Sequence, residues 1–187
     1  ARWGHSNRQE NLLTRVSALM LDGHFVIEHS ARQAAQRCFN FNGTAGIWRK
    51  SCIAEAGGWS ADTVTEDLDL SYRAQMLGWK FIYRNDHIAE AELPATMSAF
   101  RAQQHRWAKG SIQVGRKLVL PILRSPLSWQ KKLEAMLHLS ANLAFPTTLA
   151  LLLLLPFTRN KSLSEPLTMI IFCSTTLSVM GFYALSQ

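Results

Sequence analysis

The residues that could do chemistry in this chain form two short polar clusters. They are the tripeptide Thr65-Glu66-Asp67 and the group Gln103, Arg106 and Trp107. A carboxylate such as that of Asp67 can remove the proton of a hydroxyl group as its oxygen attacks. A guanidinium group offers paired donors to phosphate oxygens, and an indole ring can cover the apolar face of a sugar. Together the clusters suggest transfer of a sugar from a diphosphate.

The first cluster is predicted to open a helix. The run Thr63-Val64-Thr65-Glu66 fits a capping box, and the apolar stripe that follows it is ended by Gly78. Asp67 then lies in the first turn, where the backbone amides favour a carboxylate. The alternative is that Glu66 and Asp67 only stabilise the start of this helix.

Asp67 and Asp69 form an Asp-x-Asp string, which invites a metal-site interpretation. On a helix, however, two residues of separation turn the side chains about 200° apart. They cannot readily hold one ion, so we expect one carboxylate to face the site and the other to face away. Asp67 is the favoured general base.

The second cluster lies on a predicted amphipathic helix from about Ala95 to Leu120, whose apolar residues recur at intervals of three, four or seven. Gln103, Arg106 and Trp107 stand at positions i, i+3 and i+4, so their side chains are neighbours on one face. An amide, a guanidinium and an indole can therefore converge on one ligand. The alternative is that Arg106 and Trp107 are an anchor pair at a membrane interface.

The basic charge is concentrated in one belt. Between Arg101 and Lys132 there are eight Lys or Arg residues and no acid; the net charge of the chain is +7, so the rest is close to neutral. Nucleic acid is the first partner that such a belt suggests. The belt lacks interleaved aromatic platforms and stands before an apolar run, so we expect membrane lipids and no nucleic acid.

Two apolar runs follow the belt. Leu139 to Phe157 is nineteen residues without a charge, and a second uncharged run covers Leu167 to Ser186. A helix needs about 20 apolar residues to span a bilayer, so the runs predict two transmembrane helices joined by the link Thr158–Pro166. The position of the belt places the preceding region in the cytoplasm. The alternative is a pair of buried helices in a soluble protein.

The region before the belt is predicted to be mixed α and β. Helices are expected at Leu12–Leu21 and Ser51–Ala56, a strand and loop at Phe39–Trp48, and an alternating strand at Trp79–Tyr83. Three cysteines, an odd number without metal spacing, favour a reducing compartment. We therefore expect three parts: residues 1–94, a basic helical region at 95–132, and a transmembrane hairpin at 133–187.

These residues carry a family resemblance. Thr65-Glu66-Asp67, then Gln103-x-x-Arg106-Trp107 and apolar spans, resembles the family 2 glycosyltransferases, particularly membrane-embedded polysaccharide synthases similar to cellulose and mannan synthases. The stretch Phe41-Asn42-Gly43-Thr44 resembles the acceptor-proximal motif of that family, with Asn42 where some members have cysteine.

The resemblance implies a fold, a reaction and a set of partners. The α/β region would be the C-terminal part of a GT-A domain, and the reaction an inverting transfer of a hexose from a nucleotide sugar, a UDP- or GDP-hexose, to a growing β-linked polysaccharide. A divalent cation, Mg²⁺ or Mn²⁺, is expected on the diphosphate, with its ligands upstream of this chain and none within it. We therefore expect the 187-residue piece alone not to bind nucleotide sugar productively.

The resemblance also implies roles for individual residues. Asp67 would be the catalytic base. The substrate-binding residues would be Gln103, Arg106, Trp107, Glu66, Thr65, Asn42, Gly43 and Thr44. The protein would be a multi-pass protein of the inner, cytoplasmic membrane with its catalytic part in the cytoplasm. The resemblance does not say whether accessory subunits bind it. Two alternatives remain: transfer of a single sugar to a lipid acceptor, and a non-catalytic membrane anchor or partner subunit.

Overall fold

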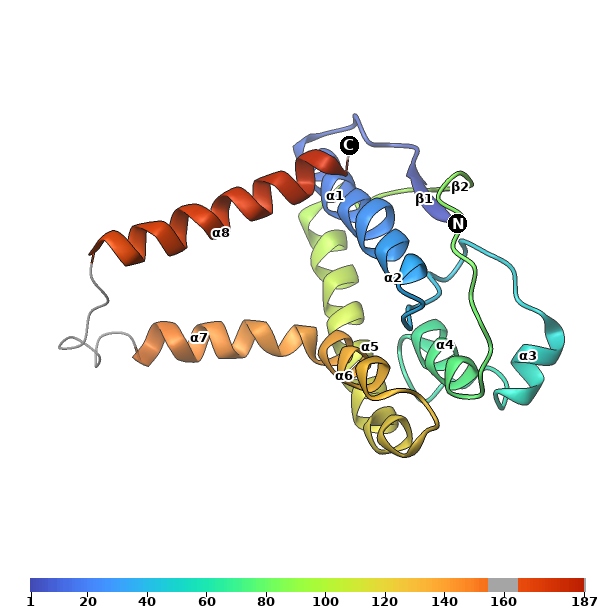
Figure 1. The fold of residues 1–187 in the computed structure, drawn as a ribbon. Coiled ribbons are helices and arrows are strands. Elements are labelled where there is room, and N and C mark those ends of the chain that lie inside the picture. The colour runs from blue at the N-terminus through green and yellow to red at the C-terminus, as the bar shows by residue number, and fades with distance from the viewer. Residues whose placement is uncertain (155–164, 187) are drawn as a thin grey trace.

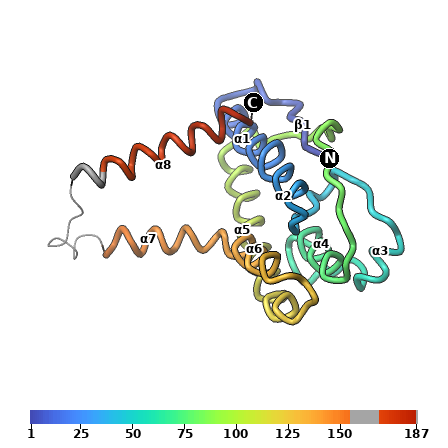
Figure 2. Tube along the Cα trace, viewed as in Figure 1, coloured from blue at the N-terminus to red at the C-terminus, as the bar shows by residue number. Residues whose placement is uncertain are grey.

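The computed structural model describes residues 1–154 and 165–186, without the side chains of residues 165–168. It consists of a lobe of packed helices and loops, from which two long helices, α7 and α8, project on the same side (Figures 1 and 2). The two strands lie at the edge of the lobe beside the N-terminus. The candidate site residues all lie within the lobe.

The strands confirm an α/β class but form a small sheet in the described part of the chain. β1 (Arg2–His5) and β2 (Ile88–Ala91) pair in parallel, with Arg2 opposite Ile88 and His5 opposite Ala91. Neither strand was predicted. Each is four residues long, and the pairing joins segments more than eighty residues apart, so no local pattern marks it.

The first helical segment is a near-continuous run of three elements: α1 (Leu12–Asp22), the π-helical η1 (Gly23–His29) and α2 (Ser30–Ala34). The predicted helix at Leu12–Leu21 is confirmed. Its start is fixed by a reciprocal cap, in which Asn11 Oδ1 accepts from the Thr14 N–H and Thr14 Oγ1 accepts from the Asn11 N–H, both at 3.0 Å.

The helices α3 (Lys50–Glu55) and α4 (Glu66–Met76) agree with prediction in position. α4 ends just before Gly78, whose φ of +91° suits glycine. The predicted capping box is wrong: it would make Thr63 the N-cap residue, but α4 begins at Glu66 with Thr65 as its N-cap, and the side chain of Thr65 makes no capping hydrogen bond. That side chain packs instead against Gly110 of the next long helix.

The helical hairpin of α5 (Met97–Arg124) and α6 (Trp129–Ser140) builds the main core of the lobe. The predicted helix over Ala95–Leu120 is confirmed, and it continues four residues further, through Pro121. Its residues Val114, Leu118 and Ile122 are buried against Tyr72 of α4 and Leu139 of α6. Burying each such apolar side chain contributes about 1.5–3 kcal/mol, so α4, α5 and α6 form one packed unit.

Two strand predictions are wrong. Phe39–Trp48 is a loop, and Trp79–Tyr83 is not assigned to any strand. The burial along Trp79–Tyr83 still alternates, with Tyr83 buried and Ile82 exposed. Alternation alone does not make a strand, because a strand requires hydrogen bonds to a neighbouring one, and none of the described segments pairs with it.

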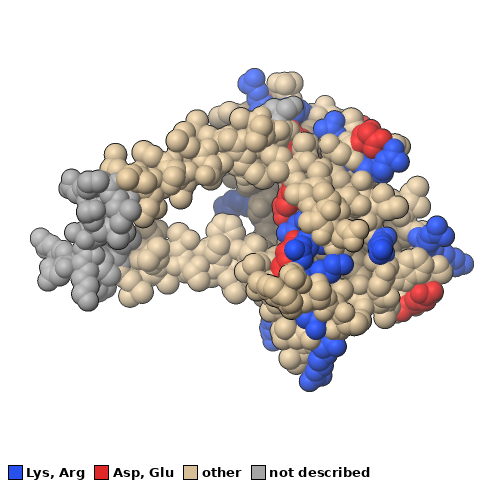
Figure 3. All heavy atoms as spheres, in the orientation of Figure 1, with Lys and Arg blue, Asp and Glu red and all other residues tan. Residues whose placement is uncertain are grey.

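The apolar runs form η2 (Ala141–Leu143), α7 (Ala144–Leu154) and α8 (Glu165–Leu185). By length and composition one helical stretch of the described residues, Trp129–Leu154, could cross a membrane; within α8 the described apolar stretch, Met169–Leu185, is shorter than that one. The second predicted span is therefore not confirmed. The end of the first run, and the link from residue 158 to residue 164, lie outside the described residues. The visible surfaces of α7 and α8 carry no charged side chain, whereas the lobe carries many (Figure 3).

Candidate functional site

The carboxylate of Asp67 is held at the start of α4 by two backbone amides. Its Oδ1 accepts a hydrogen bond from the Leu68 N–H at 2.8 Å, and its Oδ2 accepts one from the Gly43 N–H at 2.9 Å. Gly43 has a φ of +52°, a left-handed conformation that glycine adopts without steric cost. The loop Asn42–Thr44 is thus joined directly to the candidate base.

A second contact ties the same loop to α4. The Phe41 N–H donates to Ser71 Oγ at 2.8 Å, and the Ser71 hydroxyl donates to the carbonyl oxygen of Asp67 at 2.5 Å. Asn42 closes a turn through its carbonyl oxygen, which accepts from the Ala45 N–H. The structure therefore brings Asn42, Gly43 and Thr44 together with Asp67.

The electrostatic setting of Asp67 favours proton uptake. Burial raises the pKa of this carboxyl above its ordinary value, and the hydrogen bonds from Leu68 and Gly43 offset only part of that rise. Because a carboxylate with a raised pKa is a stronger base, the position suits abstraction of a proton from a hydroxyl group.

Asp69 lies in a different environment. It is fully buried, and its carboxylate forms ion pairs with Arg73 Nη2 at 2.7 Å and with Lys117 Nζ at 3.0 Å. The carboxylate of Asp69 is thus paired with two cationic side chains, whereas the carboxylate of Asp67 faces the loop at Gly43. Among the residues that the structure describes, no group of three His, Cys, Asp or Glu side chains could hold a metal ion.

The second cluster lies beside the first because α5 passes close to the start of α4. A Cβ atom added to Gly110 would lie 2.3 Å from the side chain of Thr65, so only glycine permits this approach. The Val64 N–H donates to Gln113 Oε1 at 3.0 Å, one turn further along α5. The N-terminus of α4 therefore rests on the Gly110–Gln113 segment of α5.

The predicted cluster stands on that same side of α5. Gln103, Arg106 and Trp107 precede Gly110 by seven, four and three residues, which places all four on one face of the helix. Arg106 is exposed, and Gln103 and Trp107 are half-buried. The helix spacing thus puts the three residues on the face of α5 that meets α4, one to two turns before the contact.

Polar side chains of the site are open to a ligand. The structure gives Gln103, Arg106 and Glu66 no hydrogen bond or ion pair to any of the described residues. Thr65 Oγ1 is buried and also has no hydrogen-bond partner among them. The ring of Trp107 packs against that of Trp3 of β1, with the ring centroids 6.4 Å apart.

Sequence reasoning missed three residues that shape this site. Trp3 supports Trp107, Gly110 allows the close approach of α4, and Lys117 pairs with Asp69. Only Gly110 carried a signal, because a glycine inside a helical pattern often marks a close contact. The other two depend on segments far apart in the chain.

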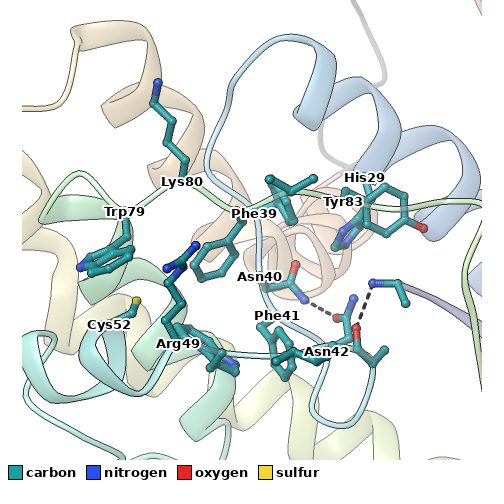
Figure 4. Close-up of a pocket in the computed structure, with 17 residues that line it drawn as sticks. His29, Phe39, Asn40, Phe41, Asn42, Arg49, Cys52, Trp79, Lys80 and Tyr83 are labelled. Carbon is teal, nitrogen blue, oxygen red and sulfur yellow. Dashed lines mark hydrogen bonds between the residues drawn. The ribbon is translucent and has the colours of Figure 1, made fainter.

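A cavity of about 370 Å³ lies next to the acceptor-like loop. Phe39, Phe41 and Asn42 line it from the loop Phe39–Trp48, and Arg49 and Trp79 line it from beyond that loop (Figure 4). Asp67 and the α5 cluster do not line it. We therefore do not include this cavity in the candidate site.

Comparison with known proteins identifies similar sequences over most of the chain. A family model described as "Glycosyl transferase family group 2" matches residues 4–185. The chain is 49% identical over 125 residues to "Glucomannan 4-beta-mannosyltransferase 2" of Arabidopsis thaliana, covering 67% of this chain and 23% of that protein. It is 46% identical over 125 residues to "Glucomannan 4-beta-mannosyltransferase 1" of Oryza sativa subsp. japonica, covering 67% of this chain and 24% of that protein. The chain thus spans about a quarter of these relatives, and no solved structure matches it.

Proposed function

The chain belongs to glycosyl transferase family group 2, and from this premise we propose that it carries the acceptor and leaving-group half of a GT-A transferase site. The reaction is an inverting transfer of a hexose from a nucleotide sugar to a β-linked polysaccharide. The observation that supports the proposal is that the Gly43 loop bonds to Asp67 and that the start of α4 packs on α5 at Gly110, one turn after Arg106.

Asp67 acts as the general base in this proposal. Its carboxylate accepts the proton of the attacking acceptor hydroxyl, and its raised pKa supports that role. The two backbone amides fix the carboxylate in one orientation, so proton transfer needs no reorganisation of the base. Asn42, Gly43 and Thr44 border the acceptor hydroxyl, and Glu66 and Thr65 line the approach from α4.

In this proposal Arg106 binds the diphosphate of the leaving nucleotide. It is exposed and without a partner among the described residues, on the side of α5 that faces the start of α4. A guanidinium pairs with diphosphate oxygens through parallel donors, which stabilises the charge that develops as the nucleotide leaves. Trp107 offers its ring to the acceptor sugar, and Gln103 donates to one of its hydroxyls.

The divalent cation expected for this reaction finds no site among the described residues. Asp69, the other aspartate of α4, is already paired with Arg73 and Lys117. The steps assigned here therefore run through Asp67 and Arg106, and no step is derived through a metal ion.

The membrane placement rests on the apolar helices. α7 leaves the lobe directly after the α5–α6 hairpin, and its Leu149, Leu152 and Phe145 are exposed. Exposed apolar side chains at this density suit a bilayer. We propose that residues 1–94 and the basic region 95–132 lie on the cytoplasmic side of the inner membrane, together with α6, which packs into the lobe, and that α7 enters the bilayer.

The donor sugar is best tested as mannose first, because the names of the curated relatives describe mannosyl transfer. Membranes that contain the full-length protein are incubated with radiolabelled GDP-mannose and, in parallel, UDP-glucose. The expected result is label in an insoluble polymer that an endo-β-mannanase or endo-β-glucanase releases. Label only in solvent-extractable lipid would replace this proposal with single-sugar transfer to a lipid, and no incorporation from either donor would favour a non-catalytic anchor.

A further inference from the structure

We propose that Lys117 is a positioning residue for this reaction: with Asp69 and Gln113 it clamps α4 onto α5 and so fixes Asp67 relative to Arg106. We call Asp69, Gln113 and Lys117 the interhelix clamp. The inference rests on the proposed function, because the distance that the clamp sets matters only if Asp67 and Arg106 act on one substrate.

Lys117 connects three parts of the lobe. Lys117 belongs to α5. Its Nζ atom lies 3.0 Å from Asp69 Oδ1 of α4 and 2.9 Å from a carboxylate oxygen of Asp62, in the loop that leads into α4. Burial opposes the charge of Lys117, but the two carboxylates outweigh it and raise the pKa of the lysine. The ammonium group therefore stays charged and holds both segments.

The other end of the clamp is fixed as well. Asp69 is fully buried and accepts from Arg73 Nε at 2.9 Å, and Arg73 Nη2 donates to the carbonyl oxygen of Gly58 at 2.8 Å. Asp69 cannot turn away from Lys117 without giving up one of the two cationic side chains that compensate its buried charge, which is costly. The ion pair thus joins two rigid elements.

The clamp and the substrate residue stand in one row along α5. Arg106, Gly110, Gln113 and Lys117 are separated by four, three and four residues, the spacing of a single helix face. Gly110 and Gln113 contact Thr65 and the Val64 N–H, directly before Asp67. Any shift of α4 along this row changes the distance from Asp67 to Arg106.

The use of an ion pair between Lys117 and Asp69 supports a role in positioning α4 on α5 rather than only in stabilising the fold. Well-packed apolar residues often hold two helices at least as firmly as a buried ion pair does. An ion pair with a hydrogen-bonded carboxylate, however, specifies one register between the helices. A displacement of about 1 Å in reacting groups can lower a rate about 100-fold, so such a register has direct value for the transfer step.

The test compares Lys117→Met with Arg116→Met in the full-length protein in membranes, with labelled GDP-mannose and UDP-glucose as donors. Arg116 is the adjacent, exposed residue of the same basic belt and has no partner among the described residues. We expect Lys117→Met to lower kcat at least tenfold while KM for the donor stays within twofold, because Lys117 contacts no substrate. Lys117→Arg restores most of kcat, and Arg116→Met leaves both constants unchanged.

Several outcomes contradict the clamp. A folded Lys117→Met protein with kcat within twofold of wild type overturns it, as does a loss that Arg116→Met shares equally. If Lys117→Met does not accumulate, Gln113→Leu carries the test: it removes only the acceptor for the Val64 N–H, and an unchanged kcat there overturns the clamp.

The failure of the clamp is separable from failure of the proposed function. Full activity of Asp67→Asn contradicts the proposed base whatever Lys117 does. Loss of activity in Asp67→Asn together with full activity in Lys117→Met contradicts the clamp alone.

Discussion

Asp67 and Asp69 show how one helix turn gives two identical side chains opposite environments. Asp67 meets only backbone amides and has a raised pKa, whereas Asp69 is fully buried between Arg73 and Lys117. The helix geometry that predicted their divergence is the geometry observed, with the side chains on different faces. The partners of Asp69 were not predictable, because Lys117 stands forty-eight residues further along the chain.

The raised pKa of Asp67 predicts a pH dependence of the transfer reaction. The base works only when ionised, so kcat/KM should fall as pH drops through the pKa of Asp67. That fall should be centred above about 3.9, the ordinary value for aspartate. The measurement is the initial rate of sugar incorporation at low donor concentration across the acidic range, with recovery checked after return to neutral pH. A rate that stays level down to the ordinary aspartate pKa would show that no such base limits the reaction.

At the scale of elements, the helices with a clear apolar period were predictable, whereas η1, α2, α6 and both strands were not. The periodic helices α1, α4 and α5 were located within a few residues, because apolar spacing and terminal residues such as Gly78 are local signals. β1 and β2, in contrast, form only by pairing with each other, and they lie far apart in the sequence. The capping box predicted for Thr63–Glu66 was wrong because α4 begins at Glu66, after Thr65, and the Thr65 side chain packs against Gly110 instead of capping the helix.

The close contact of α4 and α5 predicts that Gly110→Ala is destabilising. The new methyl group would lie 2.3 Å from Thr65, and backbone on both sides must shift to relieve the clash. We expect a loss of about 1–3 kcal/mol in the free energy of unfolding, and lower transferase activity, because the start of α4 moves. Thermal unfolding of the detergent-solubilised full-length protein measures the first effect.

Gly115→Ala is the matched control on the same helix. Its added methyl group would meet Leu139 at an ordinary distance of 3.7 Å, and alanine favours a helix over glycine by about 1 kcal/mol. The unfolding temperature should therefore stay level or rise. Equal destabilisation by both substitutions would contradict the special closeness of α4 and α5 at Gly110.

At the scale of the whole molecule, the lobe holds the candidate site residues, and the apolar helices α7 and α8 contain none of them. The lobe joins the Gly43 loop to Asp67 and packs Thr65 against Gly110, which stands one turn after Arg106 on α5, and α7 and α8 project away from it. The sequence alone suggested the candidate site residues, because their types and spacing suit a sugar and a diphosphate. It did not indicate the contacts that join them, since these depend on how α4, α5 and the Gly43 loop pack.

The central claim is that Asp67 is the base of a sugar transfer, and turnover of Asp67→Asn in the full-length protein tests it most directly. The amide keeps the size of the side chain and an oxygen that can accept one of the backbone amides, but it cannot take up the acceptor proton. Asp86→Asn, an exposed carboxylate paired with Arg84, is the control. We predict at least a 100-fold loss of kcat for Asp67→Asn, with donor binding and membrane insertion retained and the control unaffected. Turnover of Asp67→Asn within threefold of wild type would contradict the account.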